Sequence, residues 1–269
     1  ITYTDIFGNV NLIGNSGVLY NSFAAPSQQN INRSGAMGQI DGVGGDDLAF
    51  VSRTGNIYAL TSSGELIFNY QAPTAFVFSP MIADINGDGV SEVVAGGLDG
   101  KIYAITSSGA DLAGFPLHLG STFQSELAAC DLDDNGVMEI ICGLANGEFR
   151  VIKSGGLIET SYSRNLGAAV TGSPVVLSNN RIAVATSQKL FLIDTDGSIV
   201  FEKPLPAQVA GGLTLADLNR DYSLDIVFVL ISGEVYAVNQ QGQDLAGFPV
   251  STNDNFNCPP LIADIDSDS

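Results

Sequence analysis

The sequence contains no tryptophan, a single histidine, three cysteines and only ten lysines and arginines in 269 residues. One histidine, His118, cannot build a metal centre that needs several histidines. The 29 acidic residues outnumber the bases and give a net charge of −19, which is unfavourable for a protein that must neutralise phosphates. We therefore expect no nucleic-acid partner, and cations are the natural small ligands of this chain.

Long hydrophobic runs are also missing. No apolar stretch approaches the roughly 18 residues that cross a membrane, so we expect no membrane span in this chain. The sequence has no initiator methionine and no signal or transit peptide. It begins at Ile1, and we expect a mature form or an excised domain of a larger surface or secreted protein.

The three cysteines do not amount to a disulfide framework, because at most one bridge can form among them. Each lies in an apolar strand context, which favours small buried core residues. Whether two of them are bridged stays open at this stage. They are Cys130, Cys142 and Cys258.

The chain repeats itself. A turn glycine precedes an alternating apolar run, a second glycine turn and another short strand, with a period of about 45 residues. The segment "GNIYALTSSGELIF" (55–68) is matched by "GKIYAITSSGADLAGF" (100–115) and "GEVYAVNQQGQDLAGF" (233–248). Related copies are "GNVNLIGNSGVLY" (8–20), "GEFRVIKSGGLI" (147–158) and "QKLFLIDTDG" (188–197), where Gln188 replaces the glycine.

Each repeat indicates four short strands, and no segment has a helical period. Repeats of this length that form four-stranded sheets are typical of β-propeller blades. The sequence therefore predicts an all-β fold, a single six-bladed β-propeller over residues 1–269, with seven or eight blades open for a longer parent chain. The N-terminal strands would complete the last blade and close the ring. The predicted blades are 36–79, 80–126, 127–173, 174–212, 213–259, and 260–269 together with 1–35.

Four acidic loops recur between the first and second strands of the repeats. They read "DINGDGVSE" (84–92), "DLDDNGVME" (131–139), "DLNRDYSLD" (217–225) and the truncated "DIDSDS" (264–269). Side chains that carry oxygen occupy positions one, three, five and nine of the complete loops. These residues are Asp84, Asn86, Asp88 and Glu92; Asp131, Asp133, Asn135 and Glu139; Asp217, Asn219, Asp221 and Asp225; and, in the truncated copy, Asp264, Asp266 and Asp268.

This spacing suits calcium, which takes six to eight hard oxygen ligands at about 2.3–2.6 Å in irregular geometry. Position seven would add the backbone carbonyl of Val90, Val137 or Ser223. Gly89 and Gly136 ease the turn at position six, where Tyr222 is a departure. The loops predict three Ca²⁺ ions and a fourth at 264–269. An EF-hand is excluded, because its last ligand stands at position twelve between two helices.

Two repeats lack the pattern. Residues 41–47, "DGVGGDD", form a loop that is two residues shorter and has no ordered ladder of ligands. Residues 178–181, "SNNR", indicate a plain hairpin turn. Because ordinary turns serve there, strand geometry does not require the acidic version. The alternative, that the acidic loops are solvated turns without metal, stays open.

At these residues the chain resembles the FG-GAP and VCBS repeat family of calcium-binding propellers, which includes the integrin α-subunit head. The resemblance rests on "ADINGDGVSEVVAGG" (83–97), "ACDLDDNGVMEIICG" (129–143) and "ADLNRDYSLDIVFV" (216–229), and it covers nearly the whole chain. The Phe-Gly and Gly-Ala-Pro signature is absent, so the chain is closer to the bacterial VCBS-type branch. The resemblance implies calcium on one rim of the ring and ligand recognition on other surfaces.

No catalytic constellation is visible, and we expect a binding or adhesion module rather than an enzyme. A quinone cofactor is disfavoured, because the docking tryptophans of quinoprotein propellers are missing. A polysaccharide lyase would need a base and cations that face a uronate, and the chain is poorly supplied with both. That enzyme and a structural surface repeat remain the alternatives to an extracellular module that binds a protein or glycan at the cell surface.

Overall fold

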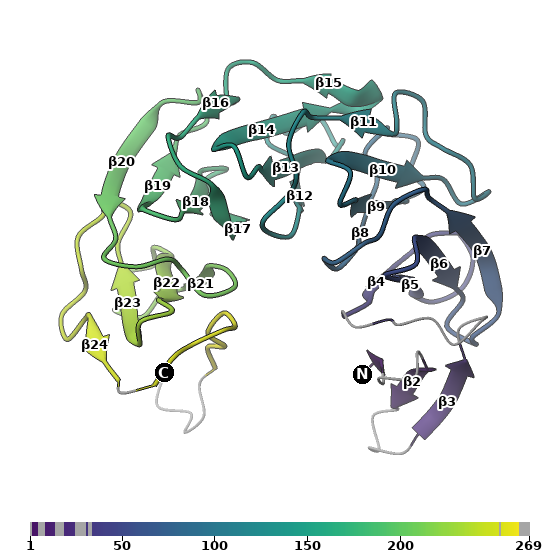
Figure 1. The fold of residues 1–269 in the computed structure, drawn as a ribbon, viewed down its shortest axis with the longest axis horizontal. Helices are drawn as coiled ribbons and strands as arrows, with labels where there is room; N and C mark the ends of the chain where they lie inside the picture. The colour runs from purple at the N-terminus through teal and green to yellow at the C-terminus, as the bar shows by residue number, and fades with distance from the viewer. Residues whose placement is uncertain are drawn as a thin grey trace. The chain divides into compact units, whose positions relative to one another are not determined.

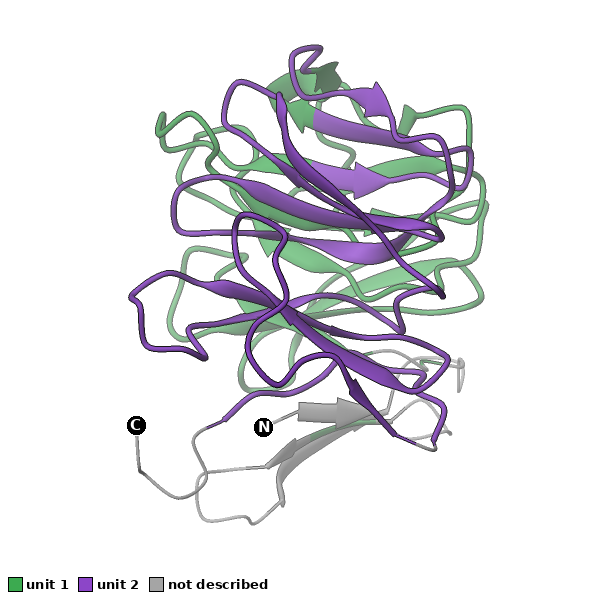
Figure 2. Ribbon diagram, turned by 90° about the vertical axis from the view of Figure 1, so that its left-hand side faces the viewer, with its two compact units in different colours: residues 1–140, 152–158 green, residues 141–151, 159–269 purple. Residues whose placement is uncertain are grey.

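A computed structural model describes residues 2–4, 9–13, 19–24, 31, 34–252 and 254–263. The chain separates into two compact units (Figure 2). The first comprises residues 1–140 and 152–158, and the second comprises residues 141–151 and 159–269. The division passes through the strands of one sheet, so that sheet contributes to both units.

The described residues form 24 strands and one 3-10 turn, Ser154–Gly156. Among them, no helix is long and apolar enough to cross a membrane. The prediction of an all-β fold is therefore confirmed.

The first unit contains three complete sheets (Figure 1). The N-terminal sheet has three strands, β1 (Thr2–Thr4), β2 (Asn9–Ile13) and β3 (Leu19–Ala24). The next sheet has four, β4 (Ala36–Gly38), β5 (Asp47–Val51), β6 (Asn56–Leu60) and β7 (Leu66–Gln71). A second four-stranded sheet follows, with β8 (Met81–Ala83), β9 (Glu92–Gly96), β10 (Lys101–Ile105) and β11 (Leu117–His118).

The sheet that the unit boundary crosses has the same four-strand path, with one strand added. Its order is β12-β13-β14-β15, and β16 pairs with β14. The strands are β12 (Ala128–Cys130), β13 (Glu139–Gly143), β14 (Glu148–Lys153), β15 (Leu157–Ile158) and β16 (Arg164–Asn165).

The second unit contains two further four-stranded sheets. One consists of β17 (Val170–Val176), β18 (Ile182–Thr186), β19 (Lys189–Ile193) and β20 (Ile199–Pro204). The other consists of β21 (Thr214–Ala216), β22 (Asp225–Val229), β23 (Glu234–Val238) and β24 (Val250–Ser251).

Every four-stranded sheet is an antiparallel meander whose middle strands are the most buried. All five residues of β5, β9, β13, β18 and β22 are buried. The fourth strands β7 and β20 alternate toward solvent. Strands covered on both faces are expected to read as continuous apolar runs, as "AFV", "VVAG" and "IVFV" do. The sheets therefore pack face to face rather than expose one side.

Each unit has its own core between successive sheets. In the first unit, Phe76 and Tyr103 meet edge to face at 5.5 Å between ring centroids, in a cluster that joins β5, β6, β9 and β10. Val10 of β2 packs with Phe50 and Tyr58, so the N-terminal sheet covers the first four-stranded sheet. In the second unit, Phe228 belongs to a cluster that joins β18 and β19 to β22 and β23.

The first strands of neighbouring sheets lie side by side within each unit. β4 contacts β8, and β8 contacts β12 (Figure 1). In the second unit, Ser173 of β17 forms a parallel bridge with Gly212, just before β21. Sheets that meet through their first strands in this way are arranged as the blades of a propeller are.

The glycine that opens each repeat has a steric reason. Gly55 has φ = 93°, and a Cβ built on it would lie 2.5 Å from the carbonyl oxygen of Thr74. Gly100 has φ = 74° and would place a Cβ 2.5 Å from the carbonyl oxygen of Ser121. The backbone conformation and the lack of room both favour glycine at this point of the repeat.

Candidate metal sites

Three acidic loops lie at equivalent places, each joining the first strand of a sheet to the second. Loop 84–92 leads from β8 into β9, loop 131–139 from β12 into β13, and loop 217–225 from β21 into β22. Strand register fixes the length of the first and the third. Eight residues separate the paired Ala83 and Glu92, and eight separate Ala216 and Asp225.

Loops 84–92 and 131–139 touch each other in the first unit. The backbone N–H of Met138 donates to the carbonyl oxygen of Asp84 at 3.0 Å. A Cβ on Gly87 would lie 2.7 Å from the Cγ2 atom of Val137. The structure thus places two of the predicted sites side by side, on neighbouring sheets.

The acid at position nine is buried in each of these loops. Glu92, Glu139 and Asp225 are only 2%, 1% and 1% exposed. Each carboxylate accepts a hydrogen bond from the backbone N–H of position two, at 3.1 Å from Ile85, 2.8 Å from Leu132 and 3.0 Å from Leu218. Burying an ionised carboxylate destabilises the fold unless the group is paired with a positive charge or binds a metal, so a compensating charge is expected at position nine.

The aspartate at position one organises the turn. Both oxygens of Asp84 accept loop N–H groups, Oδ1 from Gly87 at 2.7 Å and Oδ2 from Gly89 at 2.8 Å. Asp131 Oδ2 accepts from Gly136 at 2.7 Å, and Asp217 Oδ2 accepts from Tyr222 at 2.8 Å. The shared contact from position six to position one wraps each loop around its first carboxylate.

Positions three and five lie at the exposed side of the loops. The position-five side chain accepts the N–H of position seven, as Asp88 does from Val90 at 2.8 Å and Asn135 from Val137 at 2.7 Å. At position three, the amide of Asn86 donates to Asp88 Oδ2 at 3.2 Å and to Glu92 Oε1 at 2.8 Å. This amide holds together two carboxylates that would otherwise repel each other.

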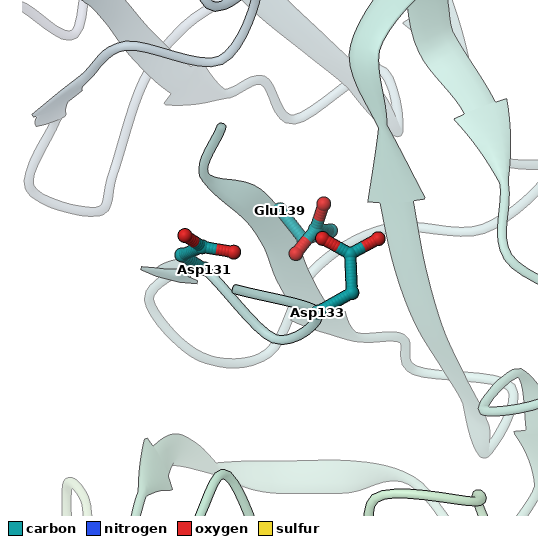
Figure 3. A group of neighbouring side chains, drawn as sticks. All are labelled: Asp131, Asp133 and Glu139. Carbon is teal, nitrogen blue, oxygen red and sulfur yellow. The ribbon is translucent and has the colours of Figure 1, made fainter. Parts of the chain in front are cut away.

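Loop 131–139 brings three carboxylates together without such an amide. Asp131, Asp133 and Glu139 each offer an oxygen within 4.8 Å of the others (Figure 3). Figure 3 shows the two aspartates on the loop and Glu139 on the strand that it enters. Lys153, at the end of β14, reaches this group and places its Nζ 3.0 Å from Asp133 Oδ2.

The electrostatics follow from this geometry. Burial, with a smaller contribution from the carboxylates of Asp88 and Asp84, raises the pKa of Glu92 to about 7, against the opposing effect of the N–H of Ile85. Burial also raises the pKa of Glu139 and of Asp225. For Glu139 the neighbouring aspartates add to the rise, and Lys153 opposes it. In each loop the ionised form of the position-nine acid is therefore disfavoured unless a positive charge lies beside it.

The truncated loop, the backbone carbonyls at position seven and the residue at position six are also part of the predicted sites. Asp264, Asp266 and Asp268 lie outside the described residues. Ligation by the carbonyls of Val90, Val137 and Ser223 stays a prediction. The departure at position six is one of residue type and not of backbone, since Tyr222 adopts φ = 65°, in the same left-handed region as Gly89 and Gly136 at 86° and 87°.

The sequence interpretation of the first repeat is wrong about the loop length. β4 and β5 pair Gly38 with Asp47, which leaves eight residues between them, as in the longer loops. The N–H of Ile40 donates to Asp47 Oδ2 at 2.8 Å, which is the contact from position two to position nine. The loop therefore spans residues 39–47 and begins at Gln39. Alignment on the first aspartate, Asp41, hid this register.

The connection between β17 and β18 is a short turn, as predicted from residues 178–181. Val176 pairs with Ile182, so only five residues intervene, and Leu177 N–H donates to the carbonyl of Arg181 at 2.8 Å. Ile182, fully buried, stands where the acidic loops carry their buried acid. The acid is thus absent where the acidic loop is absent, and strand packing does not demand it.

The structure also shows the exposure of the single histidine and of the three cysteines. His118 is exposed on β11. The three cysteines are free thiols, and no disulfide joins them. Cys142 is buried, Cys130 is half-buried and Cys258 is exposed, so the expectation of buried cysteines is confirmed for Cys142, met only in part by Cys130 and wrong for Cys258. That residue belongs to the segment after β24, which has no strand of its own among the described residues.

Comparisons with known proteins identify the fold. No protein-family model matches the chain, and no curated protein is similar in sequence. BamB from Moraxella catarrhalis aligns with a TM-score of 0.63 at 16% identity, over 97% of this chain and 88% of BamB. Sqt1 from Saccharomyces cerevisiae aligns with a TM-score of 0.70 at 19% identity, over 94% of this chain and 71% of Sqt1.

BBS1N, in a structure with ARL6DN, aligns with a TM-score of 0.62 at 16% identity, over 93% of this chain and 77% of BBS1N. At such identities the likenesses show the fold alone. The fold is a β-propeller, as the repeats predicted.

Proposed function

We propose that this chain is a calcium-stabilised β-propeller that serves as an extracellular binding or adhesion module for a protein or glycan. Six blades, closed by the N-terminal strands, complete the proposed architecture. The resemblance of the acidic loops to the FG-GAP and VCBS propellers supports the proposal. The observation that carries it is the convergence of Asp131, Asp133 and Glu139 within 4.8 Å, with the glutamate buried.

The donor set fits calcium by its chemistry. Loops 84–92, 131–139 and 217–225 offer carboxylate, amide and carbonyl oxygens and contain no histidine or cysteine. Hard oxygen ligands favour calcium or magnesium over zinc and other softer metals. Irregular loops that mix exposed and buried oxygens suit the flexible coordination of calcium better than the strict octahedron of magnesium.

The charge of the chain supports the same proposal. Three bound Ca²⁺ ions would reduce the formal net charge from −19 to −13. An ion that binds only the folded protein stabilises it by about 2.7 kcal/mol when free calcium is 100-fold above the dissociation constant. Calcium is abundant outside cells and scarce in the cytosol, and for this reason we place the module at the cell surface or in the secreted fraction.

Thermal unfolding tests the proposal directly. The protein would be melted in EDTA, in millimolar calcium and in millimolar magnesium. We expect calcium to raise the midpoint by many degrees and magnesium to raise it far less. Glu139→Gln should reduce the calcium response, whereas Glu65→Gln, at an exposed acid in the turn before β7, should leave it unchanged. A calcium response equal to that of magnesium would contradict the proposal.

A ligand is then sought in calcium. Glycan arrays and pull-downs with surface proteins, each repeated in EDTA, would identify partners whose capture depends on the metal-bound state. Calcium binding without any glycan or protein partner would favour a structural surface repeat instead.

A further inference from the structure

Loop 39–47 has the frame of an acidic loop but a glutamine at position one. Its length and its buried position-nine acid match the other loops, since Asp47 is 1% exposed and follows the same eight-residue connection. Gln39 stands where Asp84, Asp131 and Asp217 stand. Position five is Val43, which is 72% exposed and has no side-chain oxygen.

The glutamine amide makes two contacts across the loop. Its Oε1 accepts the N–H of Gly42, at position four, at 3.0 Å. Its Nε2 donates to the carbonyl oxygen of Gly45, at position seven, at 3.3 Å. The two partners fix the orientation of the amide, because a flipped amide would set oxygen against oxygen.

The first contact preserves a role that the aspartates also play. Asp84 Oδ1 accepts the N–H of Gly87, at position four, just as Gln39 Oε1 accepts that of Gly42. The second contact has no equivalent in a carboxylate, which can only accept. In loop 39–47 the position-seven carbonyl therefore accepts an N–H from the side chain at position one, which an aspartate there could not donate.

Asp47, the buried acid of this loop, also accepts hydrogen bonds from the backbone. Asp47 Oδ2 accepts from the N–H of Ile40 at 2.8 Å and from the N–H of Asp41 at 3.1 Å. Asp41 Oδ1 in turn accepts the N–H of Val43 at 2.8 Å, which closes the turn at its exposed side. Local hydrogen bonds thus hold the loop and its acid together.

We infer that the amide of Gln39 takes the place of a cation in loop 39–47, so that this loop folds without metal. The residue at position one then decides whether a loop of this frame depends on calcium. This inference rests on the proposed calcium binding by the other loops. The sheet β4–β7 provides metal-independent structure in the first unit beside the two proposed sites of loops 84–92 and 131–139.

The test is to convert the loop into a metal site. Gln39→Asp combined with Val43→Asp supplies the missing acids at positions one and five, and Val43 is exposed enough to accept the change. The number of calcium ions bound per molecule would be counted by native mass spectrometry and by isothermal titration. We expect the double variant to bind one ion more than the parent protein and to be less stable than the parent in EDTA.

Val43→Asp alone is the matched control, and it should bind the same number of ions as the parent because the Gln39 amide still spans the loop. A double variant that binds no more calcium than a calcium-binding parent would overturn the inference and leave the proposed function standing. A gain of one ion by Val43→Asp alone would also overturn it. Absence of calcium from every protein would overturn both proposals.

A variant that removes the Gln39 side-chain contacts tests the inference even if the double variant does not fold. Gln39→Ala removes both amide contacts, and we expect a lower melting temperature in EDTA with the calcium count unchanged. Asp84→Ala should instead lower the calcium count by one. A lower calcium count in Gln39→Ala would show that glutamine ligates a metal and would overturn the inference.

Discussion

The ammonium nitrogen of Lys153 lies 3.0 Å from Oδ2 of Asp133, although the two residues are 20 positions apart in the chain. Asp133 is the third of the proposed calcium ligands in loop 131–139. The ion pair joins the end of the third strand of a sheet to the loop between its first two strands. A cation of the protein itself therefore sits beside the three converging carboxylates.

The sheet β17–β20 has the same link with the charges exchanged. Arg181, in the turn between β17 and β18, places NH2 3.0 Å from Oδ2 of Asp194, just after β19. Hydrogen bonding to Arg181 lowers the pKa of Asp194. A sheet of this kind thus accommodates an ion pair between the connection of its first two strands and the end of its third strand, whether or not that connection is an acidic loop. In loop 131–139 the ion pair occupies Asp133, which is one of the proposed calcium ligands.

Lys153→Met should therefore tighten calcium binding at loop 131–139. Calcium would no longer compete with the ammonium group for Asp133. A partly exposed ion pair is worth about 1 kcal/mol at most, so we expect an affinity increase of about five-fold or less. Calcium titration followed by calorimetry would measure it.

Lys189→Met is the matched control for this substitution. Lys189 lies 3.0 Å from Glu202 and has the same 37% side-chain exposure as Lys153, but it is remote in sequence from the acidic loops. It should change calcium affinity little. Equal effects of both variants would mean that only overall charge matters.

Glu92→Gln should have opposite effects with and without calcium. In EDTA the variant should be at least as stable as the parent at pH 8, because an ionised buried carboxylate has been removed. In saturating calcium it should lose the stabilisation of one ion, about 2.7 kcal/mol at 100-fold excess over the dissociation constant. Urea unfolding in the two buffers measures both effects, and equal losses in both would contradict the metal assignment.

Acidity should stabilise the metal-free protein in a defined window. Burial raises the pKa of Glu92 from 4.5 to about 7, so the folded chain holds a proton that the unfolded chain releases between these values. The free energy of unfolding in EDTA should therefore fall as the pH rises from about 4.5 to 7. The raised pKa values of Glu139 and Asp225 act in the same direction.

Urea midpoints in EDTA at several pH values would test this dependence, and Glu92→Gln should flatten it. Calcium should act in the opposite sense, because protons compete with the metal for the same carboxylates. A metal-free protein whose stability rises across this window would show that the buried acids are already compensated.

The fold could be predicted because its signals are local. Gly55 and Gly100 mark the repeat by their spacing, and the apolar runs that follow them become buried middle strands. The acidic ladder could be predicted for the same reason, since its alternate side chains belong to one short loop.

What the sequence missed depends on contacts between distant residues or on register. Nothing near Lys153 indicates that it reaches Asp133, because strand pairing brings them together. Gln39 escaped notice because the loop was aligned on its first aspartate, Asp41, and only the pairing of Gly38 with Asp47 reveals the loop length. A search for glutamine at position one, with the buried acid eight residues later, would have found it.

Tyr222 provides a test of the loop backbone that is independent of metal. It adopts φ = 65° and is 99% exposed, so its side chain has little packing to offset the left-handed conformation. That conformation costs a non-glycine residue about 1–2 kcal/mol, of which the greater freedom of unfolded glycine cancels about 0.5–1 kcal/mol. Tyr222→Gly should therefore stabilise the protein in EDTA by about 0.5–1 kcal/mol.

Gly136→Ala is the reverse experiment at the same position of loop 131–139. Gly136 has φ = 87°, and a Cβ there would meet no atom within 4 Å, so only the backbone conformation opposes alanine. It should destabilise the protein by about 1 kcal/mol. Thermal melts in EDTA would compare both variants with the parent, which separates backbone strain from metal affinity. If Tyr222→Gly were less stable than the parent, the exposed tyrosine would have to make stabilising contacts that outweigh its strained backbone.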